Sequence, residues 1–124
     1  MPGQNLYEKY GGFAQINRIV MAFYDALLDS DEIGPYFDDV DMVRLIDHQT
    51  KFVAALMGGP AQFDDEHLHR AHARLAITDT HFDEMKAILA ETLDAHGMAS
   101  EDIETVLGAI EMRRRVVVAQ PAMS

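Results

Sequence analysis

Apolar residues recur along the chain at steps of three and four, and short breakers separate the segments that carry them. The breakers are Gly11-Gly12, Gly34-Pro35, Gly58-Gly59-Pro60 and Gly97. Steps of three and four place side chains on one face of a helix, whereas a half-buried strand alternates at every second residue. The pattern therefore predicts an all-α chain with four substantial helices and several turns.

The first two predicted helices carry the longest apolar stripes. One spans roughly residues 13 to 29, with Tyr24 at the edge of its stripe. Its stripe consists of Ile16, Ile19, Val20, Phe23, Leu27 and Leu28. The other begins near Asp41 and ends at Gly58-Gly59-Pro60, and one polar residue, Gln49, lies on its apolar face. That face otherwise consists of Met42, Leu45, Ile46, Phe52, Val53 and Leu56.

Three helical segments follow in the second half of the chain. After the acidic residues 64–66, a short helix would place Leu68, His72 and Leu75 on one face, so that His72 points inward. Thr78 or Thr80 caps the next helix, which Gly97 ends. Its apolar residues are Phe82, Met85, Leu89 and Leu93, and those of the last helix, from Ser100, are Ile103, Val106, Leu107, Ile110 and Val117.

Length and composition narrow the class of protein. A chain of 124 residues forms one domain, here residues 1–124, and 48% hydrophobic with 25% charged residues is typical of globular proteins. The net charge of −11 disfavours nucleic acid and anionic lipid as partners. The chain has no cysteine, which excludes disulfides and fits a cytoplasmic protein. Its longest uncharged stretch, Phe52 to Phe63, is 12 residues, too short for membrane insertion, and no secretory signal is apparent.

Most chemistry-bearing motifs are absent. The sequence contains no H-E-x-x-H zinc motif, no G-x-S-x-G serine elbow and no phosphate-binding glycine loop. The acidic runs that precede helices are explained by helix capping and by the helix dipole. What remains is the inward-facing His72, opposite a long helix on which His48 and Gln49 border an apolar stripe.

That combination suits a flat apolar cofactor such as haem. Haem iron needs one neutral imidazole on one side, an apolar cage, and one or two hydrogen-bonding groups on the other side. Tyr24, His48 and Gln49 could supply the second set of groups.

The chain resembles the group I truncated haemoglobins over most of residues 5–118. The resemblance rests on Tyr10-Gly11-Gly12, Phe23-Tyr24, Tyr36-Phe37 with Asp39-Val40-Asp41-Met42, His48-Gln49 with Gly58-Gly59-Pro60, and Ala71-His72-Ala73-Arg74-Leu75-Ala76-Ile77 with His81-Phe82. It implies a two-over-two helical sandwich that encloses haem b.

The resemblance also implies roles for individual residues. His72 matches the proximal iron ligand, Phe37 the aromatic residue that stacks on haem, Tyr24 the tyrosine that hydrogen-bonds iron-bound ligands, and Gln49 the distal glutamine. The expected pocket lining is Leu45, Phe52, Leu68, Leu75, Ile77, Phe82 and Met85. Covalent haem attachment is not expected, because residues 112–115 lack the histidine that some relatives use there.

His48 is a second candidate iron ligand, since some cyanobacterial and algal relatives use a histidine at the matching position. The alternative is that His48 is solvated, because it borders the polar face set by Asp41, Arg44 and Lys51. Likewise, the run Arg113-Arg114-Arg115 either complements the negative end of the last helix or places one cation near a haem propionate.

Three functions remain open from the sequence. The first is a haem protein that binds O2, NO or CO and oxidises NO to nitrate with an unidentified reductase, as the resemblance implies. In this case Tyr24 and Gln49 are the catalytic residues. The second is an electron-transfer or ligand-sensing module in which His48 and His72 both hold the iron. The third is a cofactor-free acidic helical interaction domain.

Overall fold

The computed structural model describes residues 5–59 and 77–114, and every regular element in these two ranges is helical. The elements are α1 (Leu6–Lys9), α2 (Gly12–Asp29), the 3-10 helix η1 (Gly34–Phe37), α3 (Met42–Leu56), α5 (Asp79–Ala95) and α6 (Ser100–Glu111). The predicted all-α class is confirmed, as are four substantial helices within this part of the chain. The predicted short helix with Leu68, His72 and Leu75 lies outside the described residues, as does Val117.

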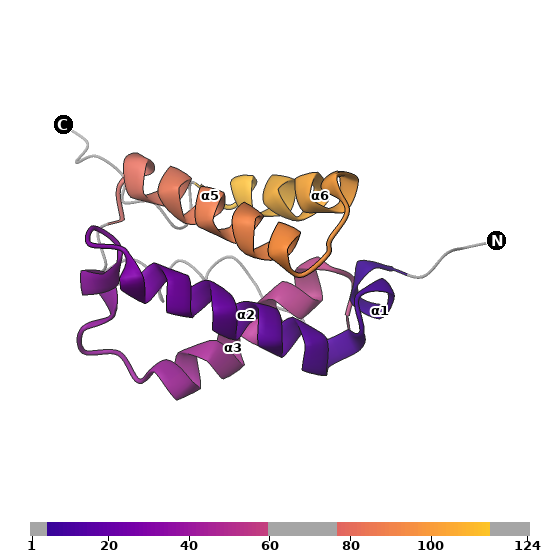
Figure 1. The fold of residues 1–124 in the computed structure, drawn as a ribbon, viewed down its shortest axis with the longest axis horizontal. Helices are drawn as coiled ribbons and strands as arrows, with labels where there is room; N and C mark the ends of the chain where they lie inside the picture. Colours follow the sequence, from indigo (N-terminus) through magenta and orange to yellow (C-terminus); the bar gives the residue numbers. More distant parts are fainter. Residues whose placement is uncertain (1–4, 60–76, 115–124) are drawn as a thin grey trace.

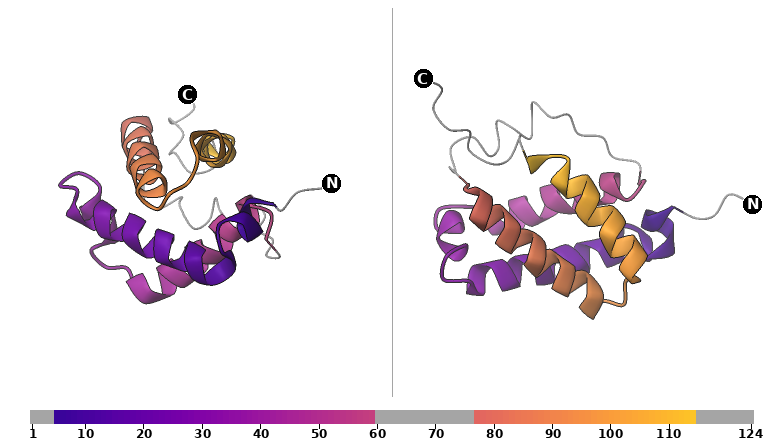
Figure 2. Two further views of the ribbon diagram at one scale, coloured as in Figure 1. Left: turned by 45° about the vertical axis from the view of Figure 1, so that its right-hand side comes forward. Right: turned by 90° about the horizontal axis from the view of Figure 1, so that it is seen from above.

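The four long helices form two layers (Figure 1). Helices α2 and α3 make one layer, and α5 and α6 make the other. Figure 2 shows α5 and α6 side by side across the α2–α3 layer, with their axes turned relative to it. The buried residues of all four helices meet between the layers in one main apolar core. This arrangement is the predicted two-over-two sandwich.

Helix α2 is the central element of the core. Ile16, Leu27 and, from the following loop, Ile33 are fully buried. Tyr24, expected at the edge of the stripe, is also buried, with 5% of its surface exposed. Leu28 was expected in the stripe, but 44% of its surface is exposed. Adjacent helical residues are about 100° apart, so a face centred near Leu27 turns Leu28 toward solvent.

Helix ends follow local signals in most places. Gly58 and Gly97 follow α3 and α5 with φ of +95° and +85°, a conformation that glycine adopts without strain. Asp41 caps α3 by accepting the backbone N–H of Arg44.

Helix α6 begins at Ser100, as predicted. The N-cap residue is Ala99, whose backbone N–H donates to the Tyr10 hydroxyl at 3.0 Å. The same hydroxyl donates to Asp102 in the first turn of α6 at 2.5 Å. A side chain from the start of the chain therefore holds the beginning of the last helix.

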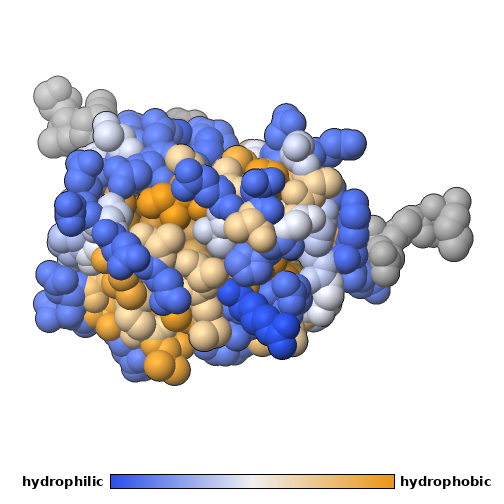
Figure 3. Space-filling view, in the orientation of Figure 1, coloured by the Kyte–Doolittle hydropathy of each residue, from blue (hydrophilic) through white to orange (hydrophobic). Residues whose placement is uncertain are grey.

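On the face drawn in Figure 3, polar side chains lie mainly around the rim, and apolar side chains gather in the centre and at the lower left. Exposed large apolar residues of the described part include Leu28, Val40 and Val43. Within residues 5–59 and 77–114, no helix combines the length and the apolar character needed to cross a membrane.

The cap of α5 provides a test of the local signals. The Thr78 hydroxyl accepts the backbone N–H of His81 at 3.1 Å, whereas Thr80 is an exposed residue of the first turn. We expect Thr78→Ala to lower the free energy of unfolding by about 1 kcal/mol, because the cap bond is lost. Thr80→Ala, the matched control, should leave stability equal or slightly higher, since alanine favours helix. Urea unfolding followed by circular dichroism measures both, and equal losses would contradict the assignment.

Candidate functional site

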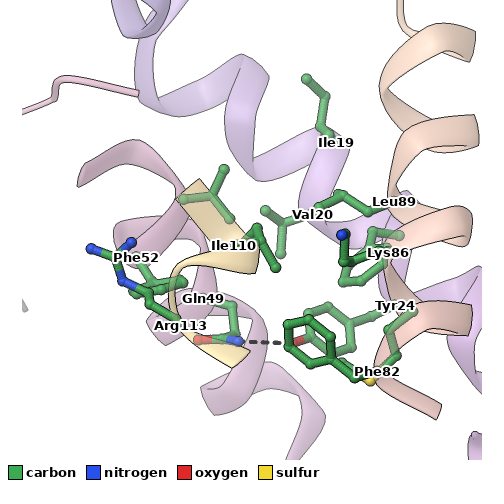
Figure 4. Close-up of a pocket in the computed structure, with 13 residues that line it drawn as sticks. Ile19, Val20, Tyr24, Gln49, Phe52, Phe82, Lys86, Leu89, Ile110 and Arg113 are labelled. Carbon is green, nitrogen blue, oxygen red and sulfur yellow. Dashed lines mark hydrogen bonds between the residues drawn. The ribbon is translucent and has the colours of Figure 1, made fainter. Parts of the chain in front are cut away.

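A mostly apolar cavity lies between the two helical layers (Figure 4). Its volume is about 80 Å³, several times the roughly 10–15 Å³ that one water molecule requires. All four long helices contribute to its wall, which consists of Ile19, Val20, Phe23, Tyr24, Gln49, Phe52, Val53, Phe82, Met85, Lys86, Leu89, Ile110 and Arg113. The cavity is therefore large enough for a diatomic ligand.

Two polar side chains, Tyr24 and Gln49, face one another in this apolar wall. The Gln49 Nε2 atom donates a hydrogen bond of 3.0 Å to the Tyr24 hydroxyl oxygen, drawn as a dashed line in Figure 4. Because that oxygen acts as the acceptor, the hydroxyl proton of Tyr24 remains available for another acceptor. Burial raises the pKa of Tyr24 from 10 to about 12, and the bond from Gln49 opposes part of the rise.

Aromatic rings hold Tyr24 in place. The rings of Phe23 and Phe37 each meet the Tyr24 ring edge to face, with centroids 5.1 and 5.5 Å away. Such edge-to-face pairs are favourable and restrict ring orientation. The hydroxyl of Tyr24 therefore has a defined direction.

Two cations complete the cavity wall. Lys86 lies on α5, and its Nζ donates to Glu111 at 2.7 Å. Arg113 follows α6; its Nη1 donates to the Ala109 carbonyl at 2.8 Å, and its guanidinium lies 5.7 Å from the Phe52 ring centroid. An apolar ligand with carboxylate groups, such as haem, matches a wall of this composition.

Arg114, unlike Arg113, is bound by carboxylates. It makes ion pairs with Asp79 and Glu111 at 2.8 and 2.7 Å and a third pair with Asp83, and its guanidinium lies over the Phe82 ring. The bonds from Arg114 and Lys86 lower the pKa of Glu111 to about 2. Arg114 thus ties the end of α6 to the start of α5 beside the cavity.

The structure brings together five of the residues predicted for the site. Tyr24, Gln49, Phe52, Phe82 and Met85 all line the cavity. Three further predicted residues lie next to this group. Ile77 is buried with Phe52 and Phe82, Leu45 packs against the main core, and Phe37 contacts Tyr24.

The two predicted iron ligands, His48 and His72, are not among the described residues of the cavity wall. His48 is exposed on α3 and does not line the cavity. His72 lies outside the described residues together with Leu68 and Leu75, so its role stays a prediction. Within the described ranges, no three His, Asp or Glu side chains come together as a metal site.

Sequence reasoning missed Lys86 as a cavity residue. The signal was present, because Phe82, Lys86 and Leu89 are spaced four and three residues apart and so share one face of α5. A lysine on an otherwise apolar helical face can bury its stem and keep its amine at the rim of a cavity.

Comparison with known proteins agrees with this geometry. The family model described as bacterial-like globin matches residues 5–118. A group 1 truncated haemoglobin from Synechocystis sp. is 32% identical over 119 residues, covering 90% of this chain and 96% of its own. Another, from Mycolicibacterium paratuberculosis, is 32% identical over 106 residues, covering 86% of this chain and 78% of its own.

Solved structures agree as well. The Fe(III) form of truncated haemoglobin from Tetrahymena pyriformis superposes with a TM-score of 0.86 at 29% identity, covering 94% of this chain and all of that one. The 2/2 haemoglobin of Synechococcus sp., in the cyanomet state with covalently attached haem, superposes with a TM-score of 0.82 at 30% identity. This match covers 92% of this chain and 98% of that one. The chain belongs to the bacterial-like globin family, as a group I truncated haemoglobin with a haem cofactor.

Proposed function

We propose that this haem protein binds O2 and NO in the cavity beside Tyr24 and oxidises NO to nitrate with electrons from a reductase. The observation that carries the proposal is the Tyr24–Gln49 pair, a directed polar group in a mostly apolar cavity. Family membership supports haem-based ligand binding, and we assign the proximal imidazole to His72. The haem is b-type and non-covalent, and the absence of cysteine supports a cytoplasmic location.

Tyr24 acts as a hydrogen-bond donor to the ligand. When bound, the haem iron supplies a site for diatomic gases and exchanges electrons. A phenol whose pKa is about 12 keeps its proton near neutral pH, so Tyr24 can donate to an oxygen atom that carries partial negative charge. Bound O2 carries more such charge than CO, and the pair therefore favours O2.

Gln49 acts through Tyr24. Its amide donates to the phenol oxygen and so turns the phenol proton away from α3. Hydrogen bonds in a chain polarise one another, which strengthens the second bond, from Tyr24 to the ligand. Gln49 is thus a positioning residue as well as part of the cavity wall.

The rest of the cavity wall excludes water, and the reaction itself requires an electron donor. O2, NO and one electron together give nitrate, so each cycle consumes one electron that a reductase must return. Apolar side chains such as Val20, Phe52 and Leu89 keep water out of the cavity, which limits competing loss of the reactive gases. The reductase and the role of His48 as a second iron ligand stay predictions.

Alkaline pH tests the protonation of Tyr24. Its pKa is raised in the fold from 10 to about 12, so its contribution to stability is complete below pH 10 and is lost as pH rises through 12. We expect the wild type to lose about 2–3 kcal/mol more than Tyr24→Phe across this window. Urea unfolding at several alkaline pH values measures the difference, and parallel losses in both proteins would refute the raised pKa.

Ligand release tests the donor role of Tyr24. A hydrogen bond to a charged group contributes about 1.5–3 kcal/mol, so Tyr24→Phe should release O2 about 10- to 100-fold faster. Stopped-flow displacement of O2 by CO measures the rate. Tyr7→Phe makes the same one-atom change in α1, away from the cavity, and should match the wild type. An unchanged rate in Tyr24→Phe would contradict the proposal.

A further inference from the structure

A second tyrosine near the cavity has a base as its partner. The Tyr36 hydroxyl and His81 Nδ1 are 2.7 Å apart, and their rings meet edge to face. On the other side of the imidazole, His81 Nε2 lies 3.4 Å from Glu32 Oε1. With the Nε2–H tautomer, Tyr36 donates to Nδ1 while Nε2–H points at the carboxylate.

These three residues lead from the cavity wall to the surface. Tyr36 packs against the buried cluster of Phe52, Ile77 and Phe82, and two of these side chains line the cavity. The His81 side chain is 22% exposed and that of Glu32 is 65% exposed. Only one layer of side chains therefore separates Tyr36 from the cavity. The base beside it, His81, is partly exposed to solvent.

We propose that Tyr36 and His81 form a proton-coupled electron relay, which carries electrons from a reductant at the surface to the haem site after a hydroperoxide has oxidised that site. The relay rests on the proposed function in one respect, because it requires haem next to the cavity. Electrons from a small reductant at the surface pass through Tyr36 to the haem site. Glu32 stabilises the positive charge that His81 gains.

The steps balance in electrons and protons. When a hydroperoxide oxidises the haem site by two electrons, the peroxide O–O bond breaks and an alcohol and water form from the peroxide and two protons. Tyr36 then returns one electron while its O–H bond breaks, and the proton moves to His81 Nδ1. Each reductant molecule gives one electron to the Tyr36 radical and releases one proton to solvent, and the Tyr36 oxygen recovers its own proton from His81. The protons released by two reductant molecules replace the two consumed in forming the alcohol and water. Two such transfers restore the haem site.

Tyr24 cannot take this role. Its hydroxyl oxygen accepts a proton donor, the Gln49 amide, and no base among the described cavity residues stands ready to take its proton. A phenol radical forms readily only when the phenol proton can leave at the same time. Tyr36 has that outlet at 2.7 Å, whereas no described residue of the cavity wall offers one to Tyr24.

The surface around the relay selects the reductant. Asp29, the last residue of α2, and Asp31 and Glu32, in the segment that follows, are all exposed. Their negative charge repels anionic reductants and favours neutral or cationic ones. The substrate class is therefore phenols and aromatic amines rather than carboxylate-bearing donors.

The test adds hydrogen peroxide to the ferric haem-loaded protein and records freeze-quenched electron paramagnetic resonance spectra. We expect a tyrosyl radical in the wild type and in Tyr7→Phe, and its loss in Tyr36→Phe. His81→Gln keeps an acceptor for the phenol but cannot take a proton, so radical formation should slow by about 100-fold. In the wild type, formation should also be slower in D2O.

Several results would overturn the relay. They are a radical that survives Tyr36→Phe, an unchanged rate in His81→Gln, no isotope effect in D2O, or no radical in the wild type. The D2O measurement uses the unaltered chain and so does not depend on how a variant folds. If the relay fails while Tyr24→Phe still speeds O2 release, ligand binding stands without it. A protein that takes up no haem would overturn both proposals.

Discussion

A buried phenol must have a hydrogen-bond partner, and this requirement organises the α2–α3 layer. Tyr24 lies in the apolar interior, where an unpaired hydroxyl would cost about 1–3 kcal/mol. The amide of Gln49, on α3, donates a hydrogen bond to this hydroxyl. Between the same two helices, the Asn17 amide donates to the buried Thr50 hydroxyl at 3.0 Å. Two polar pairs thus bind helices whose other contacts are mostly apolar, and such directional bonds favour one register of the helices over its neighbours.

Local signals in the sequence predicted the helices and several residues of the cavity wall, whereas non-local partners could not be predicted. Gln49 stood out as the polar member of an apolar stripe, and that position does place it in the cavity wall. The error at Leu28 arose because periodicity gives the direction of a stripe but not its width. The start of α6 at Ser100 was predicted, but the hydrogen bond from the backbone N–H of the N-cap residue Ala99 to the Tyr10 hydroxyl, 89 residues away in the sequence, was not. No window of sequence contains that contact.

The cations around the cavity differ in how fully they are neutralised. Arg114 is bound by three carboxylates, and Lys86 shares one of them, Glu111. Arg113 instead contacts a backbone carbonyl and the Phe52 ring, neither of which carries a formal charge. In the described part of this acidic chain, Arg113 is therefore the cavity cation best suited to receive a haem carboxylate. The acidic residues beside Arg114 prevent it from competing.

The two tyrosines near the cavity illustrate how a partner sets the chemistry of a side chain. Tyr24 receives a hydrogen bond from an amide, so its proton stays and can only be shared with a ligand. Tyr36 faces an imidazole, so its proton has somewhere to go. A base beside Tyr24 would draw the phenol proton away from bound O2 and so weaken the hydrogen bond from Tyr24 to O2. Under the two proposals above, the position of the base on the far side of Phe52 and Phe82 would let one cavity retain O2 through one phenol and receive electrons through the other.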